Sequence, residues 1–284
     1  MIAVHVARER PEAITIALDL AERLAAVGLS TVGADAADAD ALGVPEAATA
    51  PGTLRAVVAV GGDGTVLEGV HHALAAGCPL TGVNVGRVGF LAETEPDRLE
   101  SLVAVLASDN PPVVPRMGIA ASIAGTDAVG LNDVVIQKAA GRHMIAVDIL
   151  VDGVRFLTYR ADGVIISTPT GSSAYTLSAG GPLLDPRIDA LVVTPIAPYS
   201  LFRASVALHP DATLECTTIL DHAALITVDG RDLGTVAPGG TVTIRRGPDI
   251  PFLDVLGRSY PEALKAKLRL HEGLDGVLGD PDRR

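Results

Sequence analysis

The sequence predicts an α/β N-terminal domain with a parallel sheet, followed by a second domain of mostly antiparallel β-strands. Up to residue 110, short apolar runs alternate with helical patterns, which is typical of parallel strands joined by right-handed helical crossovers. After Asn110-Pro111-Pro112 the apolar runs become short and rich in β-branched residues, and turn residues separate them. The predicted domains are 1–112 joined by 257–284, and 113–256.

In the first domain, strands are predicted at 2–6, 55–60 and 80–85, and helices at 12–27 and 66–76. The spacing of Ile14, Leu18 and Leu24 predicts that they share one buried side of the first helix. Gly28 follows that helix where a C-terminal glycine cap is expected. Residues 34–50 show no clear periodicity, so no element is predicted there.

In the second domain, strands are predicted at 145–151, 154–159, 164–167, 191–194, 225–228 and 241–244, with no helix between them. Asp152-Gly153 separates two alternating runs and predicts a hairpin with a type I′ turn. A final helix is predicted over 261–270, because Leu264 and Leu268 lie four residues apart. We expect this helix to pack back on the first domain.

The composition narrows the class of protein. A net charge of −12 argues against general affinity for nucleic acid or for an anionic membrane. A phosphate ligand stays compatible with this charge, because glycine loops and helix N-termini bind phosphate without many cations. No apolar run is long enough to span a membrane, and the first residues lack the basic segment of a signal peptide. Cys78 and Cys216 lie far apart without metal-ligand spacing, which favours a reduced, cytoplasmic setting.

Gly61-Gly62-Asp63-Gly64-Thr65 lies between a predicted strand and a predicted helix. Glycines permit positive φ and close backbone approach to a ligand, and the start of a helix adds the positive end of its dipole. Asp63 could then orient a hydroxyl nucleophile or hold a metal-bound phosphate, as phosphoryl transfer requires. An ordinary strand-to-helix turn with an Asp near the helix N-cap accounts for the same residues.

A second loop, within 161–181, places hydroxyl side chains, Gly and Pro directly after the β-branched run at 164–166. Packing alone does not require so many small polar residues after a buried strand. Backbone N–H groups and hydroxyls at this density suit a polar ligand instead. Together, the two loops predict a phosphate-bearing substrate held between two parts of the protein.

These motifs resemble those of the NAD kinases, in that family's order and approximate spacing. The matching segments are Gly61–Thr65, Asn84–Leu91, Asn132-Asp133, Asp162–Gly181, Val228–Gly230 and Phe252–Leu256. The resemblance covers nearly the whole chain and implies an N-terminal domain like that of NAD kinases and diacylglycerol kinases. The glycine motif is shared with lipid kinases and phosphofructokinases, whereas the block at 168–181 is specific to the family.

The resemblance implies transfer of the γ-phosphate of ATP, or of a phosphate of polyphosphate, to the 2′-hydroxyl of the adenosine ribose of NAD, forming NADP. Asp63 would activate that hydroxyl, and Gly61, Gly62, Gly64 and Thr65 would bind the phosphate donor. A divalent ion, most simply Mg²⁺, is also expected, because the charge of the triphosphate must be neutralised during transfer. No side-chain cage for it is visible in the sequence, so the nucleotide is expected to carry most of it. The family further implies a homodimer or homotetramer, with catalysis in the cleft between the domains.

The resemblance also implies the NAD-binding residues. Asn132 and Asp133 would bind the adenosine part, and Asp162 the nicotinamide end. The remaining positions are Phe90, Thr170, Ser173, Ala174, Tyr175 and Ser178. Two residues depart from the family pattern, since Asp133 stands where Glu is usual and Ser173 where Thr is usual.

Structural explanations remain open for several of these residues. Asn132-Asp133 could simply start a strand, Asp162-Gly163 could be a turn, and Phe90 and Tyr175 could be core or interface aromatics. Asp229-Gly230 fits a β-turn as well as a functional role. The histidine pair His71-His72 and the single His143 lack the spacing of metal ligands and are expected to be structural.

Two other classes of protein stay open as well. One is another glycine-loop kinase, acting on a lipid or a sugar phosphate, which accounts for Asp63 but not for 167–178. The other is a non-catalytic dinucleotide sensor, which would keep the pocket without the chemistry.

Overall fold

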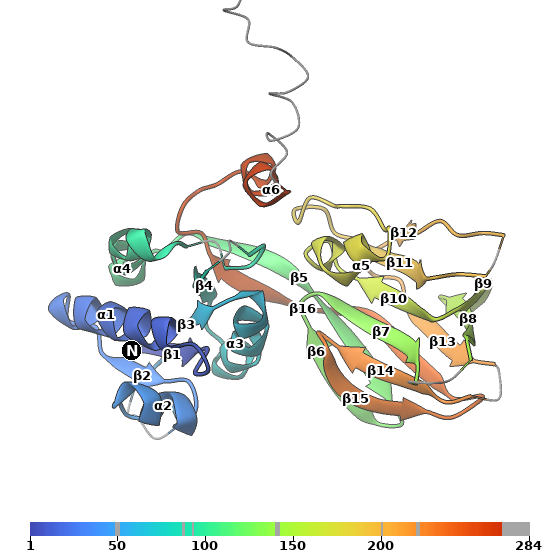
Figure 1. Ribbon diagram of the computed structural model, residues 1–284, viewed down its shortest axis with the longest axis horizontal. Helices are drawn as coiled ribbons and strands as arrows, with labels where there is room; N and C mark the ends of the chain where they lie inside the picture. The colour runs from blue at the N-terminus through green and yellow to red at the C-terminus, as the bar shows by residue number, and fades with distance from the viewer. Residues whose placement is uncertain are drawn as a thin grey trace, which may run out of the picture. The chain divides into compact units, whose positions relative to one another are not determined.

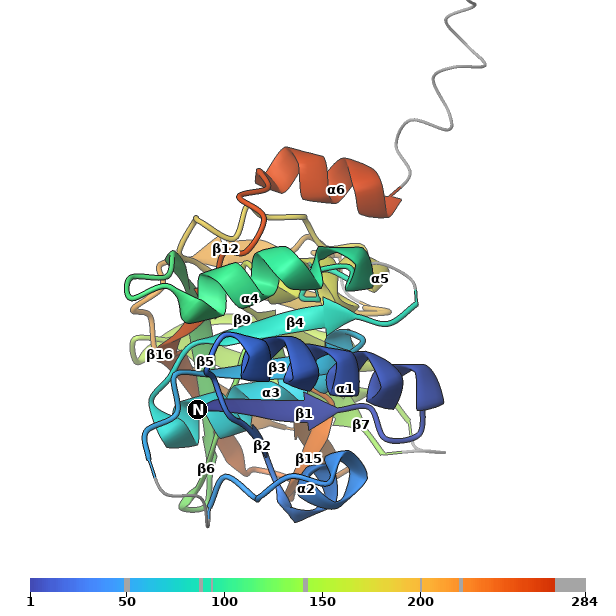
Figure 2. The same cartoon turned by 90° about the vertical axis from the view of Figure 1, so that its left-hand side faces the viewer.

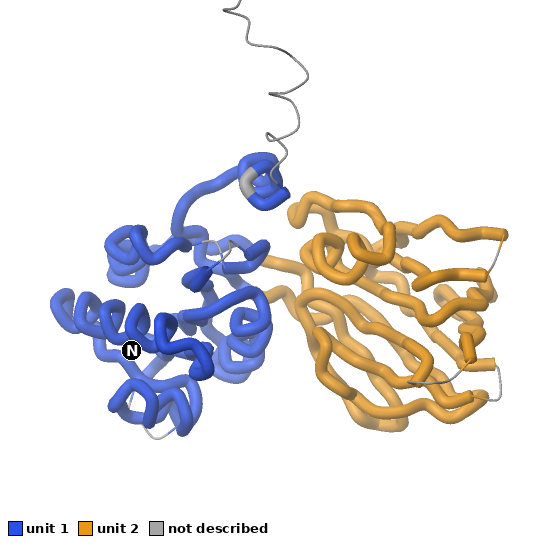
Figure 3. Tube along the Cα trace, in the orientation of Figure 1, with its two compact units in different colours: residues 1–114, 251–284 blue, residues 115–250 orange. Residues whose placement is uncertain are grey.

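The computed structural model describes residues 1–48, 52–86, 89–92, 94–139, 143–199, 201–219 and 222–268. The chain divides into two compact units, of residues 1–114 with 251–284 and of residues 115–250 (Figure 3). We call them unit 1 and unit 2. Among the described residues, no helix combines the length and the apolar character that a membrane crossing needs.

Unit 1 is built on a parallel sheet, as predicted. Its strands are β1 (Ile2–Val6), β2 (Thr31–Gly33), β3 (Ala56–Gly61) and β4 (Leu80–Asn84), in the order β2-β1-β3-β4. Its helices are α1 (Pro11–Ala26), α2 (Ala36–Leu42), α3 (Asp63–Ala76), the short 3₁₀ helix η1 (Pro96–Arg98), α4 (Leu99–Ala107) and α6 (Tyr260–Leu268). Helices α1 and α4 cover one face of the sheet, and α3 covers the other (Figures 1 and 2).

The connections of this sheet create a switch point between β1 and β3. Helix α1 leads from β1 outward to β2, whereas α3 leads from β3 to β4 in the opposite direction. The loops that leave β1 and β3 therefore diverge over the opposite faces of the sheet. In such sheets a ligand binds in the crevice at the carboxyl ends of the strands at this point.

Two details of unit 1 differ from the prediction. Residues 34–50 contain helix α2, capped by Asp35, whose side chain accepts from Asp38 N, and by Gly43 at φ 64°. A helix of 7 residues is too short to show a clear hydrophobic period. In α1, Leu18 is 42% exposed, because the small Ala13 and Ala17 form the side that lies on the sheet, together with Leu20 and Leu24. Gly28 has the predicted left-handed conformation, at φ 80°.

Unit 2 contains two antiparallel sheets. The six-stranded sheet has the order β12-β11-β10-β7-β14-β15, and the second joins β16-β13-β8-β9 with the hairpin β5-β6. Unit 2 thus matches the predicted β architecture. The strands are β5 (Val113–Ile123), β6 (Thr126–Gly130), β7 (Asp133–Lys138), β8 (Ile145–Val151), β9 (Val154–Ala161), β10 (Gly163–Ser167), β11 (Leu191–Ile196), β12 (Val206–Leu208), β13 (Leu214–Thr218), β14 (Ala224–Val228), β15 (Arg231–Val236) and β16 (Thr241–Leu253).

The core of unit 2 lies between these sheets. Buried side chains such as Ile136 and Ile166 of one sheet pack with Ile149 and Ile244 of the other. The predicted type I′ turn is present, since Asp152 and Gly153 have φ 51° and 76°. The prediction of no helix was wrong in one place, where η2 (Gly171–Ser173) and α5 (Tyr175–Ser178) follow β10.

The C-terminal part of the described chain returns to unit 1. The last residues of β16 belong to this unit, where Phe252 pairs in parallel with Leu80 of β4. Helix α6 begins one residue before the predicted start and is described to Leu268, so the predicted residues 269 and 270 lie outside the described residues. Within unit 1, the Lys267 ammonium lies 3.9 Å from the centre of the Phe90 ring.

Candidate functional site

A pocket opens at the switch point of unit 1. It has a volume of about 270 Å³, and its lining among the described residues comes from the end of β1 and from the segments that follow β1 and β3. The lining residues are Val6, Ala7, Arg8, Glu9, Arg10, Gly62, Gly64, Thr65 and Glu68. Three of the four residues proposed to bind the phosphate donor are among them, and Gly61 is the buried last residue of β3. Arg8 and Arg10, which the sequence analysis did not single out, add positive charge to this pocket.

The glycine loop borders this pocket. Gly61, Gly62 and Gly64 do not use the positive φ that glycine permits. A Cβ at Gly62 or Gly64 would meet open space, and both residues face the pocket. Helix α3 begins at Asp63, and the first N–H groups of a helix lack partners within the helix. The loop therefore offers N–H groups without a partner inside the helix, and the positive end of α3, to an anion.

Asp63, in the first turn of α3, is held by the chain segment that follows Gly89. Its carboxylate accepts hydrogen bonds from the backbone N–H groups of Phe90, Leu91 and Ala92, at 2.7, 2.9 and 3.1 Å. Gly89 makes this approach possible, because a Cβ at that position would lie 1.9 Å from Asp63 Oδ1. The carboxylate is half-buried and fixed in orientation, as a positioned base requires.

His5, at the end of β1, connects two acidic side chains beside this pocket. Its Nδ1 lies 2.7 Å from Asp38 Oδ2, and its Nε2 lies 2.9 Å from Oε2 of the pocket residue Glu68. Burial alone would lower the pKa of His5, but the hydrogen bonds and charges of Asp38 and Glu68 outweigh burial and raise it. An imidazole between two carboxyl groups thus lies behind the pocket, in contact with its lining residue Glu68.

In unit 2, the predicted adenosine-binding pair lies at the start of β7. Asn132 and Asp133 are 8% and 5% exposed, and the backbone N–H groups of Leu131, Asn132 and Asp133 all donate to Asp229, at 2.6, 2.8 and 3.1 Å. Asp229 and Gly230 have φ 50° and 78°, so the predicted β-turn is present. The same Asp229 that forms the turn also fixes the Asn132-Asp133 segment.

Burial and the nearby charge of Asp229 raise the pKa of Asp133 to about 7. The unfolded chain loses this proton near pH 4, whereas the folded chain holds it up to about pH 7. Over that window the folded state binds more protons, so stability falls as the pH rises.

Asp133→Asn removes this dependence, because asparagine has nearly the same shape and no charge. We expect Asp133→Asn to be more stable than the parent at pH 8, on the order of 2–4 kcal/mol, with the difference vanishing near pH 4. Urea unfolding at pH 4, 6 and 8 measures this, and the exposed Asp127→Asn in the same unit is the matched control. A difference that does not change with pH would contradict the interpretation.

The hydroxyl-rich block after β10 is more structural than its sequence indicates. Thr168 Oγ1 donates to Leu131 O at 2.6 Å, and Ser172 Oγ accepts from Leu184 N at 2.9 Å. The hydroxyls of Thr168 and Ser172 are buried and therefore hold the loop itself. The proposed contact residues differ in exposure, since Tyr175 and Ser178 are exposed, Ser173 and Ala174 are half-buried and Thr170 is buried.

The same block is packed tightly against the Asn132 backbone. Thr168 N donates to Asn132 O at 2.9 Å, and Asp133 pairs with Ser167 across β7 and β10. A Cβ at Gly171 would lie 2.0 Å from Asn132 O, so only glycine fits there. The structure therefore brings the predicted adenosine-binding pair and the 170–178 loop together.

Asp162 lies apart from that cluster. It precedes β10, whereas Thr168 follows it, and a strand of this length separates the two by roughly 17–20 Å. The Asp162 carboxylate forms an ion pair of 2.6 Å with Lys138, which the sequence analysis did not identify. Phe90 belongs to unit 1. Arg87 and Val88, in the segment that resembles the family, lie outside the described residues.

Comparison with known proteins decides the family. The family models described as ATP-NAD kinase N-terminal domain and ATP-NAD kinase C-terminal domain match residues 44–110 and 131–252. The chain is 36% identical over 216 residues to the NAD kinase of Methanocorpusculum labreanum, covering 75% of this chain and 79% of that protein. The chain belongs to the NAD kinase family. It is also 35% identical over 273 residues to the NAD kinase of Chlorobaculum tepidum, with 94% and 95% of the two chains covered.

Solved structures of NAD kinases and NADH kinases share the fold. Yeast NADH kinase complexed with NADH has a TM-score of 0.81 at 19% identity, covering 100% of this chain and 89% of that one. The NAD kinase from Archaeoglobus fulgidus in complex with ATP has a TM-score of 0.73 at 23% identity, covering 96% and 98%. The predicted NAD kinase-like fold is therefore confirmed.

Proposed function

We propose that this chain is an NAD kinase, which transfers the γ-phosphate of ATP to the 2′-hydroxyl of the adenosine ribose of NAD. The observation that carries the proposal is the Asp63 carboxylate at the start of α3. The backbone N–H groups of residues 90–92 hold it in place, and its neighbours Gly62 and Gly64 line a pocket suited to phosphate. Membership in the NAD kinase family supports the choice of acceptor.

In unit 1, the triphosphate would occupy the pocket at the switch point. The N–H groups at the start of α3, with Gly62, Gly64 and Thr65, would face its terminal phosphates, and Arg8 and Arg10 would balance part of its charge. The described pocket lining contains two carboxylates, Glu9 and Glu68. Two carboxylates suit a Mg²⁺ ion that arrives with the nucleotide better than a protein cage, and such an ion supplies charge neutralisation during transfer.

In the proposed reaction, Asp63 accepts the proton of the 2′-hydroxyl as the ribose oxygen forms its bond to the γ-phosphorus. The bond between that phosphorus and the β–γ bridging oxygen breaks, and ADP leaves with the electron pair. A carboxylate has about four lone-pair positions, so three N–H bonds leave room for the hydroxyl.

In unit 2, the Asn132-Asp133 segment and the 170–178 loop would bind the adenosine end of NAD. Tyr175 offers an exposed aromatic face for a base, and Asn132 offers amide hydrogen bonds. Asp162 would bind the nicotinamide end, but it lies at the other end of β10 and is already paired with Lys138.

Asp229→Ala tests whether the anchored backbone matters for acceptor binding. The change removes three hydrogen bonds to residues 131–133, and we expect KM for NAD to rise about tenfold, as the loss of about 1.4 kcal/mol implies, with a smaller change in kcat. Asp152→Ala is the matched control, because Asp152 occupies an equivalent Asp-Gly turn and accepts from Thr213 N at 2.9 Å. Equal KM values for both variants would show that only the turn is affected.

The decisive experiment for the proposed function is an assay that detects NADP after incubation of the purified chain with NAD and ATP. We expect NADP to form with ATP and Mg²⁺, and further arms replace ATP by polyphosphate and NAD by NADH. A panel of lipid and sugar-phosphate acceptors with labelled ATP covers the other glycine-loop kinases. Labelling of one of those acceptors without NADP formation would overturn the proposal, as would tight NAD binding without product.

We also propose that the protein forms a homodimer or homotetramer in the cytoplasm. Tyr199, Leu201 and Phe202, in the loop after β11, are large apolar side chains with 75%, 107% and 51% exposure. Exposed apolar groups at this density are typical of a protein–protein interface. Light scattering coupled to size-exclusion chromatography measures the assembly, and a monomer at micromolar concentration would contradict this proposal.

A further inference from the structure

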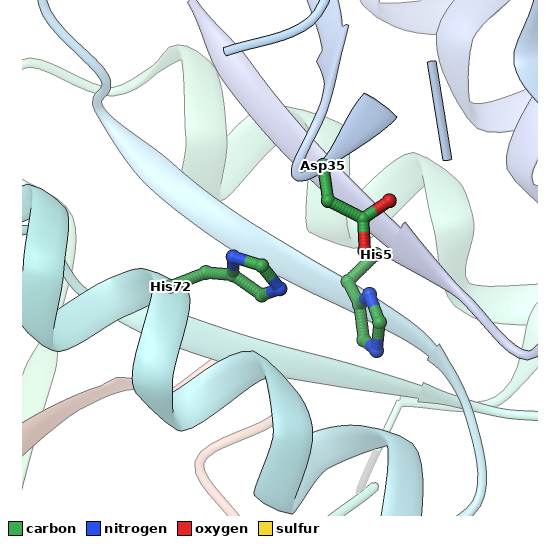
Figure 4. Close-up of side chains that lie close together, drawn as sticks. All are labelled: His5, Asp35 and His72. Carbon is green, nitrogen blue, oxygen red and sulfur yellow. The ribbon is translucent and has the colours of Figure 1, made fainter. Parts of the chain in front are cut away.

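Three side chains that could bind a metal ion meet beside the pocket of unit 1, where His5 contacts the pocket residue Glu68. His5, Asp35 and His72 each place one ligand atom so that all three atoms lie within 4.8 Å of one another. Figure 4 shows His72 from α3 and Asp35, which precedes α2, on two sides of His5. His72 was expected to be structural because it lacks ligand spacing in the sequence, whereas the structure brings it to His5 and Asp35, which lie far away in the chain.

His5 is the fixed member of this cluster. It is 3% exposed, and its Nδ1 lies 2.7 Å from Oδ2 of Asp38, whose side chain is 0% exposed. A carboxylate that bonds to one imidazole nitrogen orients the ring and its other nitrogen toward a metal, as is usual around bound zinc. Asp38 would therefore hold the ring of His5 in place for an ion.

Helix α3 brings a further carboxylate to the same place. Glu68 precedes His72 by four residues, so both project from one side of the helix. Glu68 Oε2 lies 2.9 Å from His5 Nε2, and the ring centres of His5 and His72 are 5.2 Å apart. An ion at this position would exchange a present hydrogen bond of His5 for a metal bond, with Glu68 within reach as a further ligand.

The charges around the cluster also favour a cation. Asp35, Asp38 and Glu68 surround the two imidazoles, whereas Arg8 supplies the opposing positive charge. Arg8 Nη1 lies 3.1 Å from Asp35 Oδ1 and 3.3 Å from Asp38 Oδ1. The Arg8 side chain is 42% exposed, so it can leave these carboxylates for solvent or for the adjoining pocket that it lines.

We propose that His5, Asp35 and His72 bind one divalent transition-metal ion, with Zn²⁺ as the best fit. Two imidazoles and one carboxylate are ligands that zinc accepts, whereas Mg²⁺ prefers oxygen ligands alone. Metal–ligand distances of about 2.0–2.2 Å require ligand atoms about 3.4 Å apart. The partly exposed side chains of Asp35 and His72 reach this spacing by small rotations toward the buried His5. The three proposed zinc ligands differ from Glu9 and Glu68, the pocket carboxylates proposed to face the Mg²⁺ that accompanies ATP.

The test measures Zn²⁺ binding to the full, untagged chain after dialysis against a chelator, with no nucleotide present. Titration calorimetry and elemental analysis are expected to give one Zn²⁺ per chain. His72→Gln is expected to raise Kd at least about 100-fold, because loss of even an indirect partner of a metal ligand costs 10–100-fold. His71→Gln is the matched control, since His71 is the preceding residue of α3 and lies outside the cluster, and its Kd is expected to match the parent's.

A second variant separates lost binding from lost structure. Asp35→Asn keeps the N-cap of α2, because asparagine caps helices as well as aspartate does, and is expected to weaken Zn²⁺ binding at least about tenfold. Circular dichroism establishes that each variant is folded before titration. Binding that is unchanged in folded His72→Gln and Asp35→Asn, or no stoichiometric binding to the parent chain, would overturn the proposal. The result does not depend on NADP formation, so it stands apart from the proposed function.

Discussion

Asp63→Asn is expected to lower kcat for NADP formation by about 10²–10⁴, because that is the usual contribution of one positioned general base. The amide of asparagine cannot accept the proton of the 2′-hydroxyl. It still has one oxygen that accepts backbone hydrogen bonds, so the segment 90–92 stays partly anchored. The Kd of NAD, measured by calorimetry without ATP, is expected to stay within a few-fold of the parent value.

The structure shows what else this substitution changes. The NH₂ group of asparagine would face one of the three N–H donors, and the loss of one such hydrogen bond costs about 1–3 kcal/mol. A fall of several degrees in Tm is therefore expected, and rates are compared well below that temperature. Turnover within about threefold of the parent would show that Asp63 is not the base.

Gly89→Ala is the second change with a large expected effect, and it leaves the carboxylate intact. A Cβ at residue 89 would lie 1.9 Å from Asp63 Oδ1 and 2.5 Å from its Cγ, so the carboxylate or the segment after Gly89 must move. Misplacement of a catalytic group by about 1 Å can cost about 100-fold in rate. We therefore expect kcat to fall about 100-fold while the Kd of NAD changes little.

Gly64→Ala gives the contrast, because a Cβ there meets open space and alanine suits a helix better than glycine. Gly64 faces the pocket, so its substitution is expected to raise KM for ATP rather than to lower kcat. Steady-state kinetics with ATP as the varied substrate distinguishes the two variants. The clash at Gly89 would be irrelevant to catalysis if both variants changed kcat equally.

Much of the fold could be predicted from local patterns. β1 was predicted with its observed bounds, and the glycine cap at Gly28 and the turn at Asp152-Gly153 depend on neighbouring residues alone. Helix α2 was missed because 7 residues give too little periodicity, and Leu18 was misplaced because alanines form the packed side of α1. Short elements and alanine-rich faces are decided by tertiary packing rather than by local pattern.

The sequence allowed the key residues of the candidate site to be named, but it did not allow their hydrogen-bond partners to be predicted. Asp63 could be named from the glycine motif, but the N–H groups that hold it come 27 to 29 residues later in the chain. Asp229 was identified as a turn residue, and its partners at 131–133 are 96 to 98 residues away. Neither link has a local sequence signal, since the donors are backbone groups that every residue except proline possesses.

The anchoring of residues 131–133 by Asp229 has a consequence for redesign of the enzyme. All three hydrogen bonds use the main chain, so they impose the path of this segment without regard to its side chains. The side chains at 132 and 133 can therefore be changed, to residues other than proline, without removing the groups that form these hydrogen bonds. A library at these two positions, limited to side chains that fit a buried site, is the natural starting point for changing the dinucleotide preference of the proposed acceptor site.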